Sequence, residues 1–142
     1  MSISIKITGK GLFQATNEIN RIKNFSSFLK EVGQNLESST KLRFNKGIDP
    51  DGNKWKPRSE KYKESLRKKR RLNNKVLVLT GQLQKSISYA YDSKEVNIGT
   101  NIKYGEFHQE GLGHMPKREF LGISSDDEQK IEKIVEKHIQ GK

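Results

Sequence analysis

Cysteine is absent from this chain of 142 residues. Its absence excludes a disulfide framework, a cysteine nucleophile and a thiolate-ligated zinc ion, and it is typical of proteins that fold in a reducing compartment. Long apolar runs are missing as well, so the sequence holds neither a membrane helix of about 18 residues nor the apolar segment of a signal peptide. We therefore expect a chain that folds in the cytoplasm and has no membrane partner.

Apolar residues are also scarce. They make up 31% of the sequence, beside 32% charged residues, whereas soluble globular proteins average about 45–50% apolar. The length fits one domain over residues 1–142. Because few side chains are available for a core, we expect either that part of the chain lacks a fold or that other subunits complete its burial.

The net charge of +11 is concentrated in residues 54–75, which read KWKPRSEKYKESLRKKRRLNNK. This segment holds eleven Lys and Arg residues against two glutamates, a net charge of +9. Such a segment binds polyanions through counterion release, and Trp55 and Tyr62 offer faces for base stacking. The residues expected to contact DNA or an acidic partner are Lys61, Lys63, Arg67, Lys68, Lys69, Arg70 and Arg71. The alternative is a solvated charge run, either a helix over 59–72 or a mobile loop.

Apolar periodicity predicts an α+β fold, in which a small curved antiparallel sheet packs against a long N-terminal helix and a C-terminal amphipathic helix. Alternating apolar residues from Ile3 to Ile7 indicate a first strand, closed by a turn at 9–11. Apolar residues three or four apart from Phe25 to Phe44 indicate the long helix, capped by Asn24 or Ser26. A shorter helical segment is expected over 12–22, and Gly33 indicates a close approach to a neighbour.

The second half of the chain predicts the rest of the sheet and the last helix. Residues 49–52 have the composition of a turn. A second strand from Leu83 to Tyr91 and a third at Val96 and Ile98 form a hairpin, and a short strand is expected at Phe120–Leu121. Ser125 and Glu128 predict a capping box for a helix that runs to Ile139.

Catalytic chemistry finds little support. His108, Glu110 and His114 are metal-ligand types, but the two histidines are six residues apart with glycines between them, so no helix aligns them as HEXXH does. No nucleophile elbow or phosphate-binding loop is present. We therefore expect no enzyme activity, no cofactor and no metal.

Four spaced clusters together resemble the phage virion-morphogenesis family, the tail-completion proteins of Mu-like phages. Their residues are Asp49, Pro50, Gly52 and Trp55; Thr80, Gly81, Leu83 and Ser86; Gly99, Tyr104, His108, Gln109 and Gly111; and Arg118, Phe120 and Leu121. The sequence departs from the family's usual pattern at Gly105 and Glu119, where the family usually has alanine and proline.

The resemblance implies a structural protein of the virion, acting in tail completion or head-tail joining at the neck, like small tail-terminator proteins. It also implies self-association as a ring, with a hexamer favoured, and docking to other neck or tail proteins. The alternative function is a nucleic-acid-binding protein that uses residues 54–75. Within the third cluster we expect Ile98 to end a strand, Gly99 and Asn101 to form a turn or a bulge, and Tyr104 and Phe107 to pack inward. His108 and Gln109 are expected to hold this corner by hydrogen bonds.

Overall fold

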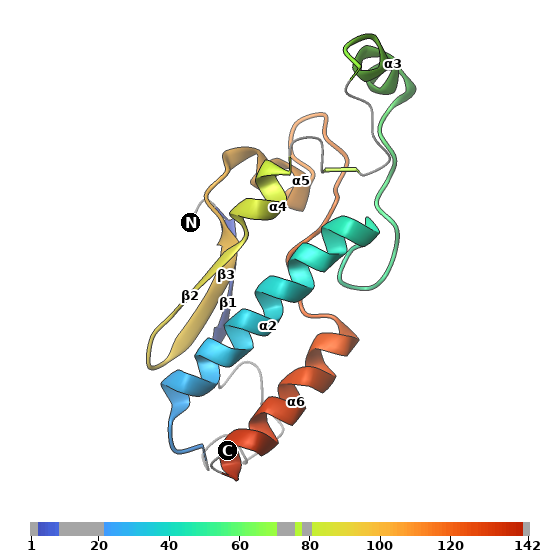
Figure 1. Cartoon of the computed structure of the whole chain (residues 1–142). Coiled ribbons are helices and arrows are strands. Elements are labelled where there is room, and N and C mark those ends of the chain that lie inside the picture. Colours follow the sequence, from blue (N-terminus) through green and yellow to red (C-terminus); the bar gives the residue numbers. More distant parts are fainter. Residues whose placement is uncertain (1–2, 9–21, 71–75, 78–80, 141–142) are drawn as a thin grey trace.

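A computed structural model describes residues 3–8, 22–70, 76–77 and 81–140. Its elements, in order, are β1 (Ile3–Thr8), α2 (Phe25–Lys46), α3 (Glu60–Lys68), α4 (Gln82–Ser86), β2 (Ser88–Tyr91), β3 (Glu95–Thr100), α5 (Lys103–Glu110) and α6 (Ser125–Ile139). Helix α2 lies between the sheet and α6 (Figure 1), which confirms the α+β fold. The turn expected at 9–11 and nearly all of the helix expected over 12–22 lie outside the described residues. None of the described helices is long and apolar enough to cross a bilayer.

The sheet is antiparallel with the order β1-β3-β2. Ile5 of β1 and Tyr89 of β2 both pair with Ile98 of β3, and Ile98 is fully buried against α2. The expectation that Ile98 ends the strand is wrong, because β3 continues to Thr100. Gly99 pairs in regular register with Ser4 and Ser88, so it lies in neither a turn nor a bulge. A Cβ at Gly99 would lie 2.0 Å from the carbonyl oxygen of Ile3, so glycine is required for the close approach of β1.

The second strand is shorter than predicted, because residues 82–86 form helix α4. Leu83 and Ile87 would share one strand face with Tyr89 and Tyr91. They are also four residues apart, however, which places them on the same side of a helical turn. Both side chains are 1% exposed. The turn starts at Gly81, whose φ is 75°, and the Ser86 hydroxyl donates to the Leu83 carbonyl at 2.6 Å.

Helix α2 carries the predicted apolar stripe. Asn24 is its cap, and its side chain accepts a hydrogen bond from the Ser27 N–H at 3.1 Å. Gly33 does mark a close approach, since a Cβ there would lie 2.6 Å from the Tyr89 ring. After α2 the predicted turn is present, with the Asp49 carboxylate accepting backbone N–H groups at 2.9 Å and Gly52 at φ 90°.

Helix α6 packs its predicted apolar face against α2, with Ile131, Ile134 and Val135 buried. Its capping box lies one residue earlier than predicted. The Ser124 hydroxyl accepts from the Asp127 N–H at 3.0 Å, and the Asp127 carboxylate accepts from the Ser124 N–H at 2.9 Å. Ser124 is selected because Asp127 is the acid that points inward: its side chain is only 2% exposed.

Arg43 of α2 is the buried partner of that carboxylate. Its guanidinium also donates to the Phe120 carbonyl at 2.8 Å and to the Gly122 carbonyl at 3.1 Å. Burial lowers the pKa of Arg43 and the charge of Asp127 opposes this, so Arg43 stays protonated at any ordinary pH. One cation thus connects α2, the segment before α6 and the first turn of α6.

We predict that Asp127→Asn lowers the free energy of unfolding by about 3–5 kcal/mol, because it leaves a buried guanidinium without its counter-charge. Asp126→Asn is the matched control, since Asp126 lies in the same helical turn but is exposed and, among the described residues, forms an ion pair only with Lys130. Its cost should stay below about 1 kcal/mol. Urea denaturation of both variants gives the comparison, and equal losses would contradict the role assigned to Asp127.

Candidate functional site

The first and third sequence clusters meet the fourth at the segment 116–122, which precedes α6. The short strand predicted at Phe120–Leu121 is not formed. The Gln109 side chain instead accepts from the Phe120 and Leu121 N–H groups, both at 2.9 Å, and donates to the Leu121 carbonyl at 3.0 Å. A side chain therefore satisfies the backbone groups that a neighbouring strand would otherwise bind. The expectation that Gln109 holds this corner by hydrogen bonds is confirmed.

The first cluster packs on the same segment. The Trp55 indole N–H donates to the Glu119 carbonyl at 2.7 Å. Phe44 lies between Trp55 and Phe120, with ring centroids 5.4 and 5.3 Å away. Pro50 lies so close to Gly122 that a Cβ there would meet its ring at 2.6 Å.

The second and third clusters are joined through α4 and α5. The hydroxyls of Ser86 and Thr100 are 2.6 Å apart, and Thr100 also accepts from the N–H that starts α5. Gly105 lies against Leu83 and Thr100, where a Cβ would be 2.9–3.0 Å from their side chains. Gly111 ends α5 at φ 68° and lets the chain reverse, as predicted. Thr80 lies outside the described residues.

Helix α5 faces the other way from the prediction. Tyr104 and Phe107 are 40% and 36% exposed, whereas Gly105, His108 and Gln109 are buried. The reason is that the polar groups of Gln109 are needed at the segment 120–121, and this fixes the rotation of the helix. Two more large apolar side chains follow it at the surface, Leu112 and Met115.

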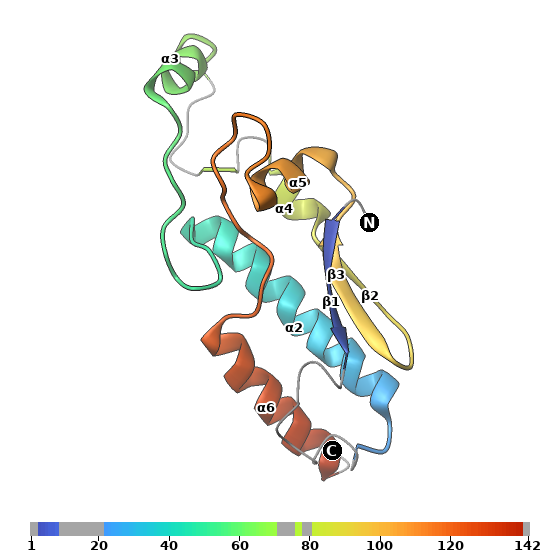
Figure 2. The ribbon, with the colours of Figure 1, turned by 180° about the vertical axis from the view of Figure 1, so that it is seen from behind.

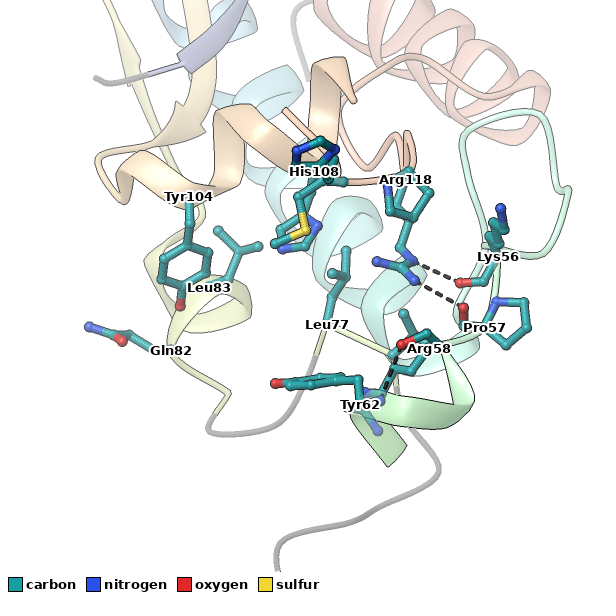
Figure 3. A pocket seen from close by; sticks show the side chains of 15 residues that line it. Lys56, Pro57, Arg58, Tyr62, Leu77, Gln82, Leu83, Tyr104, His108 and Arg118 are labelled. Carbon is teal, nitrogen blue, oxygen red and sulfur yellow. Dashed lines mark hydrogen bonds between the residues drawn. The ribbon is translucent and has the colours of Figure 1, made fainter. Parts of the chain in front are cut away.

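A cavity of about 740 Å³ lies between α4, α5, the loop 114–118 and the chain that leads to α3. Figure 3 shows Tyr104 and Gln82 on one side and Arg118 with the segment 56–58 on the other. Its walls combine basic groups with apolar and tyrosine side chains, and no carboxylate lines it among the described residues. The basic and imidazole side chains are Lys56, Arg58, His108, His114 and Arg118.

Arg118 fixes one wall of this cavity. Its guanidinium donates to the carbonyls of Lys56 and Pro57 at 2.7 and 3.1 Å, as Figure 3 shows. Its backbone N–H donates to the His108 carbonyl at 2.7 Å. Arg118 is 6% exposed, and burial, with a smaller effect of Arg58, lowers its pKa. It therefore attaches the chain that leads to α3 to the end of α5.

His108 is 9% exposed, and its Nδ1 is buried without a hydrogen-bond partner in the described part of the chain. The expected side-chain hydrogen bond of His108 is thus not found, although its carbonyl does receive the Arg118 N–H. Burial lowers the pKa of His108, and the nearby charge of Arg118 lowers it further. Within the described ranges no three His, Cys, Asp or Glu side chains gather as a metal site would require.

Helix α3 projects from the body at the end of an extended segment, as both views show (Figures 1 and 2). We call residues 54–70 the arm. Of the two interpretations of this basic segment, the helix is correct over Glu60–Lys68, with Ser59 as its cap. Leu66 is its one buried residue.

The predicted contact residues of the arm lie largely in solvent. Lys63 and Arg67 form ion pairs with Glu60 and Glu64 along the helix. The others that are described, Lys61, Lys68, Lys69 and Arg70, are exposed and form no ion pair with described residues. Arg71 lies outside the described residues.

Sequence reasoning missed Arg43 and the inward-facing Asp127. A signal for Arg43 was present, because Arg43 falls in the apolar stripe of α2 between Thr40 and Phe44, where a cation needs a buried partner. The cavity had no such signal, because its basic residues come from segments about sixty positions apart.

We predict that the folded protein loses stability as the pH falls below about 6.5, and that His108→Gln removes part of this loss. The unfolded chain protonates His108 near its ordinary pKa of 6.5, while the folded state resists protonation. The unfolded state then binds more protons, so the free energy of unfolding falls with pH in this window. Urea denaturation at about pH 7.5 and 5.5 measures the slope. His114→Gln, at an exposed position, is the control, and an unchanged slope in His108→Gln would refute the prediction.

Comparison with known proteins agrees with the cluster pattern. Residues 10–140 match the phage virion morphogenesis family. A curated relative, the Mu-like prophage FluMu G protein 1 of Haemophilus influenzae, is 28% identical over 141 residues, which cover 98% of this chain and 96% of the relative. No solved structure matches the chain with significance.

The family match spans nearly the whole chain, and the clusters that carry the resemblance form one packed region around residues 116–122. Their residues mostly support the fold. The chain therefore belongs to the phage virion morphogenesis family and has a structural role in virion assembly.

Proposed function

We propose that this chain is a tail-completion or head-tail joining subunit at the neck of the virion. It acts without catalysis, by associating with copies of itself in a ring, for which a hexamer is favoured, and by docking on neighbouring neck or tail proteins. The family supports a role in the virion. The ring and the place at the neck are our inference from the surfaces that the fold leaves uncovered.

The observation that carries the proposal is the open sheet. In the described part of the chain, β1 and β2 each pair only with β3, so each has one free edge. Exposed edges of this kind pair readily with another chain. Since the two edges are different surfaces, a contact between β1 of one copy and β2 of the next is heterologous, and such contacts form rings when the rotation closes.

Exposed apolar side chains offer a second surface for such contacts. Phe107 and Leu112 are 36% and 39% exposed and lie outside the cavity. Large apolar groups that gather on a surface are typical of sites that another protein covers. Assembly would thus remove from water the surface that a monomer leaves exposed.

We predict a purified protein with a solution mass several times that of one chain, and closed rings in negative-stain images. Phe107→Glu should reduce the assembled fraction, because burying an unpaired carboxylate in an interface is costly. Leu42→Glu is the matched control, as Leu42 is also an exposed apolar residue on a helix, 47% exposed and on α2. Analytical ultracentrifugation measures both. A monomer at all concentrations, with no rings in the images, would refute self-association.

A second function is supported by the arm. Residues 54–70 contain nine Lys and Arg residues but only two glutamates. The projecting helix exposes several of these cations to solvent. This arrangement fits non-specific contact with the phosphates of packaged DNA. It also supports the alternative of a nucleic-acid-binding protein that acts through the arm.

We predict that replacing Lys61, Lys68 and Lys69 by glutamate weakens duplex-DNA binding and flattens its salt dependence, because each lost phosphate contact lowers the slope by about one. Replacing Lys94, Lys103 and Lys133, which are exposed outside the arm, gives the same change in net charge. Fluorescence anisotropy over a range of salt concentrations compares the two triple variants. Equal losses in both would show that overall charge, and not the arm, attracts DNA.

A further inference from the structure

The cavity beneath the arm combines a cationic wall with an apolar one, and no role in the fold accounts for it. We propose that it is a docking pocket for an acidic segment of a partner protein that carries an aromatic or aliphatic side chain. This goes beyond the arm's exposed cations, because the pocket lies at the root of the arm and selects by shape as well as by charge.

The charges of the pocket call for an anionic occupant. Lys56, Arg58 and Arg118 line it together with two histidines, and no carboxylate among the described residues lies in its walls. Buried or partly buried cations are normally paired, and Arg118 meets only carbonyl oxygens in the hydrogen bonds that hold it. A carboxylate in the pocket would supply the missing negative charge at hydrogen-bond range.

The remaining walls suit an apolar side chain. Leu83, which is almost fully buried, lines the cavity together with Leu77, Met115 and the rings of Tyr62 and Tyr104. Figure 3 shows Leu77 above Tyr62 and Leu83 beside Tyr104. The volume of about 740 Å³ lies within the range of pockets that hold small ligands. A few residues of an extended peptide therefore fit, with one ring or aliphatic group on the apolar wall.

His108 adds an independent sign that the pocket is incomplete. Its ring lines the cavity, it is 9% exposed, and its Nδ1 is buried without a partner among the described residues. Unpartnered buried polar atoms are rare in folded proteins and call for an explanation. Because this atom is inaccessible to solvent, an occupant can bond to it only if the imidazole ring rotates toward the cavity.

Charge favours a different protein over a second copy of this chain as the source of the segment. Each copy carries a net charge of +11, most of it in the arm beside the pocket. Two such copies repel when one approaches the other here, whereas an acidic partner is attracted and its association accelerated. That the partner is another virion protein rests on the proposed function, but the chemistry of the pocket does not.

An occupant would contact the arm and the body at once. Lys56 and Tyr62 belong to the arm, while Tyr104 and His108 belong to α5. The hydrogen bonds of Arg118 already join these two parts at the carbonyls of Lys56 and Pro57. Binding should therefore hold the arm against the body. The rate of protease cleavage within the arm should then fall.

The test uses the full chain and fluorescein-labelled peptides in which glutamates flank one phenylalanine. We expect saturable binding by fluorescence anisotropy, at least about fivefold weaker when alanine replaces the phenylalanine, and no binding when lysines replace the glutamates. Bound peptide should also slow trypsin cleavage of the arm. A labelled thymidine oligonucleotide is measured beside them. Tighter binding of the oligonucleotide, or equal binding of the phenylalanine and alanine peptides, would overturn the proposal.

Two variants place the binding in the pocket. Tyr104→Ala and Lys56→Glu should each weaken peptide binding by at least about fivefold. Both positions are exposed, so the fold should persist. Tyr91→Ala and Lys133→Glu are the matched controls, since Tyr91 is 42% exposed on β2 and Lys133 is exposed on α6. Controls that weaken binding as much as the pocket variants would also overturn it.

The same samples separate this proposal from the proposed function. Sedimentation of each variant reports self-association, which depends on the sheet edges and Phe107 and not on the pocket. Rings without peptide binding would refute the pocket alone. Peptide binding by a protein that remains monomeric would refute the ring while the pocket stands.

Discussion

The buried guanidinium of Arg43 is the interaction on which the rest of the structure depends. It places a charge in the core, where a single neutral acceptor would not compensate it. The guanidinium therefore donates to two backbone carbonyls and to the Asp127 carboxylate. These acceptors come from the segment before α6 and from α6 itself. The direction in which the chain leaves α5 and enters α6 is therefore set by one side chain of α2.

Polar side chains also hold the backbone of the segment 116–122. No strand among the described residues pairs with its backbone, and side chains from elsewhere satisfy several of its polar groups: Gln109, Trp55 and Arg43. Gln109 and Trp55 reach the segment from two different clusters of the sequence, and Arg43 reaches it from α2. Residues from clusters that lie far apart along the chain therefore support one packed segment. Arg118 continues the pattern outward, where its hydrogen bonds join the arm to the body.

Local patterns predicted the elements well where burial on one face decided the structure. The stripe of α2, the alternation of β1 and the apolar face of α6 are examples, because each follows directly from the period of a helix or strand. Prediction failed where a polar side chain had a distant partner. Asp127 looked like one of several acids at a helix start, and only its contact with Arg43 shows that Ser124 must be the cap. Phe120 and Leu121 do not form the expected strand, because their backbone groups bond to the Gln109 side chain and not to a neighbouring strand.

The candidate site also has one part that the sequence predicts, the arm, and one part that it does not, the cavity. The arm is visible in the sequence as a charge run, since charge is a local property. The cavity is not, because Lys56 and Arg118 are neighbours only through the hydrogen bond between them. The rotation of α5 was also misjudged: the buried Gln109 turns Tyr104 and Phe107 outward. One polar residue that serves the core thus decides which side chains are left to face a partner.

Hydrogen bonds from polar side chains also explain how the fold forms with few apolar residues. The aromatic group around Phe44 and the aliphatic faces of α2, β3 and α6 form one continuous core, and long polar side chains bond the segments that the core does not cover. Such hydrogen bonds are directional and hold the body in one shape with little apolar surface. The uncovered surfaces then lie at the sheet edges, at α5 and at the pocket, where other chains can approach. A body of fixed shape with uncovered edges is suited to repeated contacts, because each copy presents the same surfaces to its neighbours without refolding.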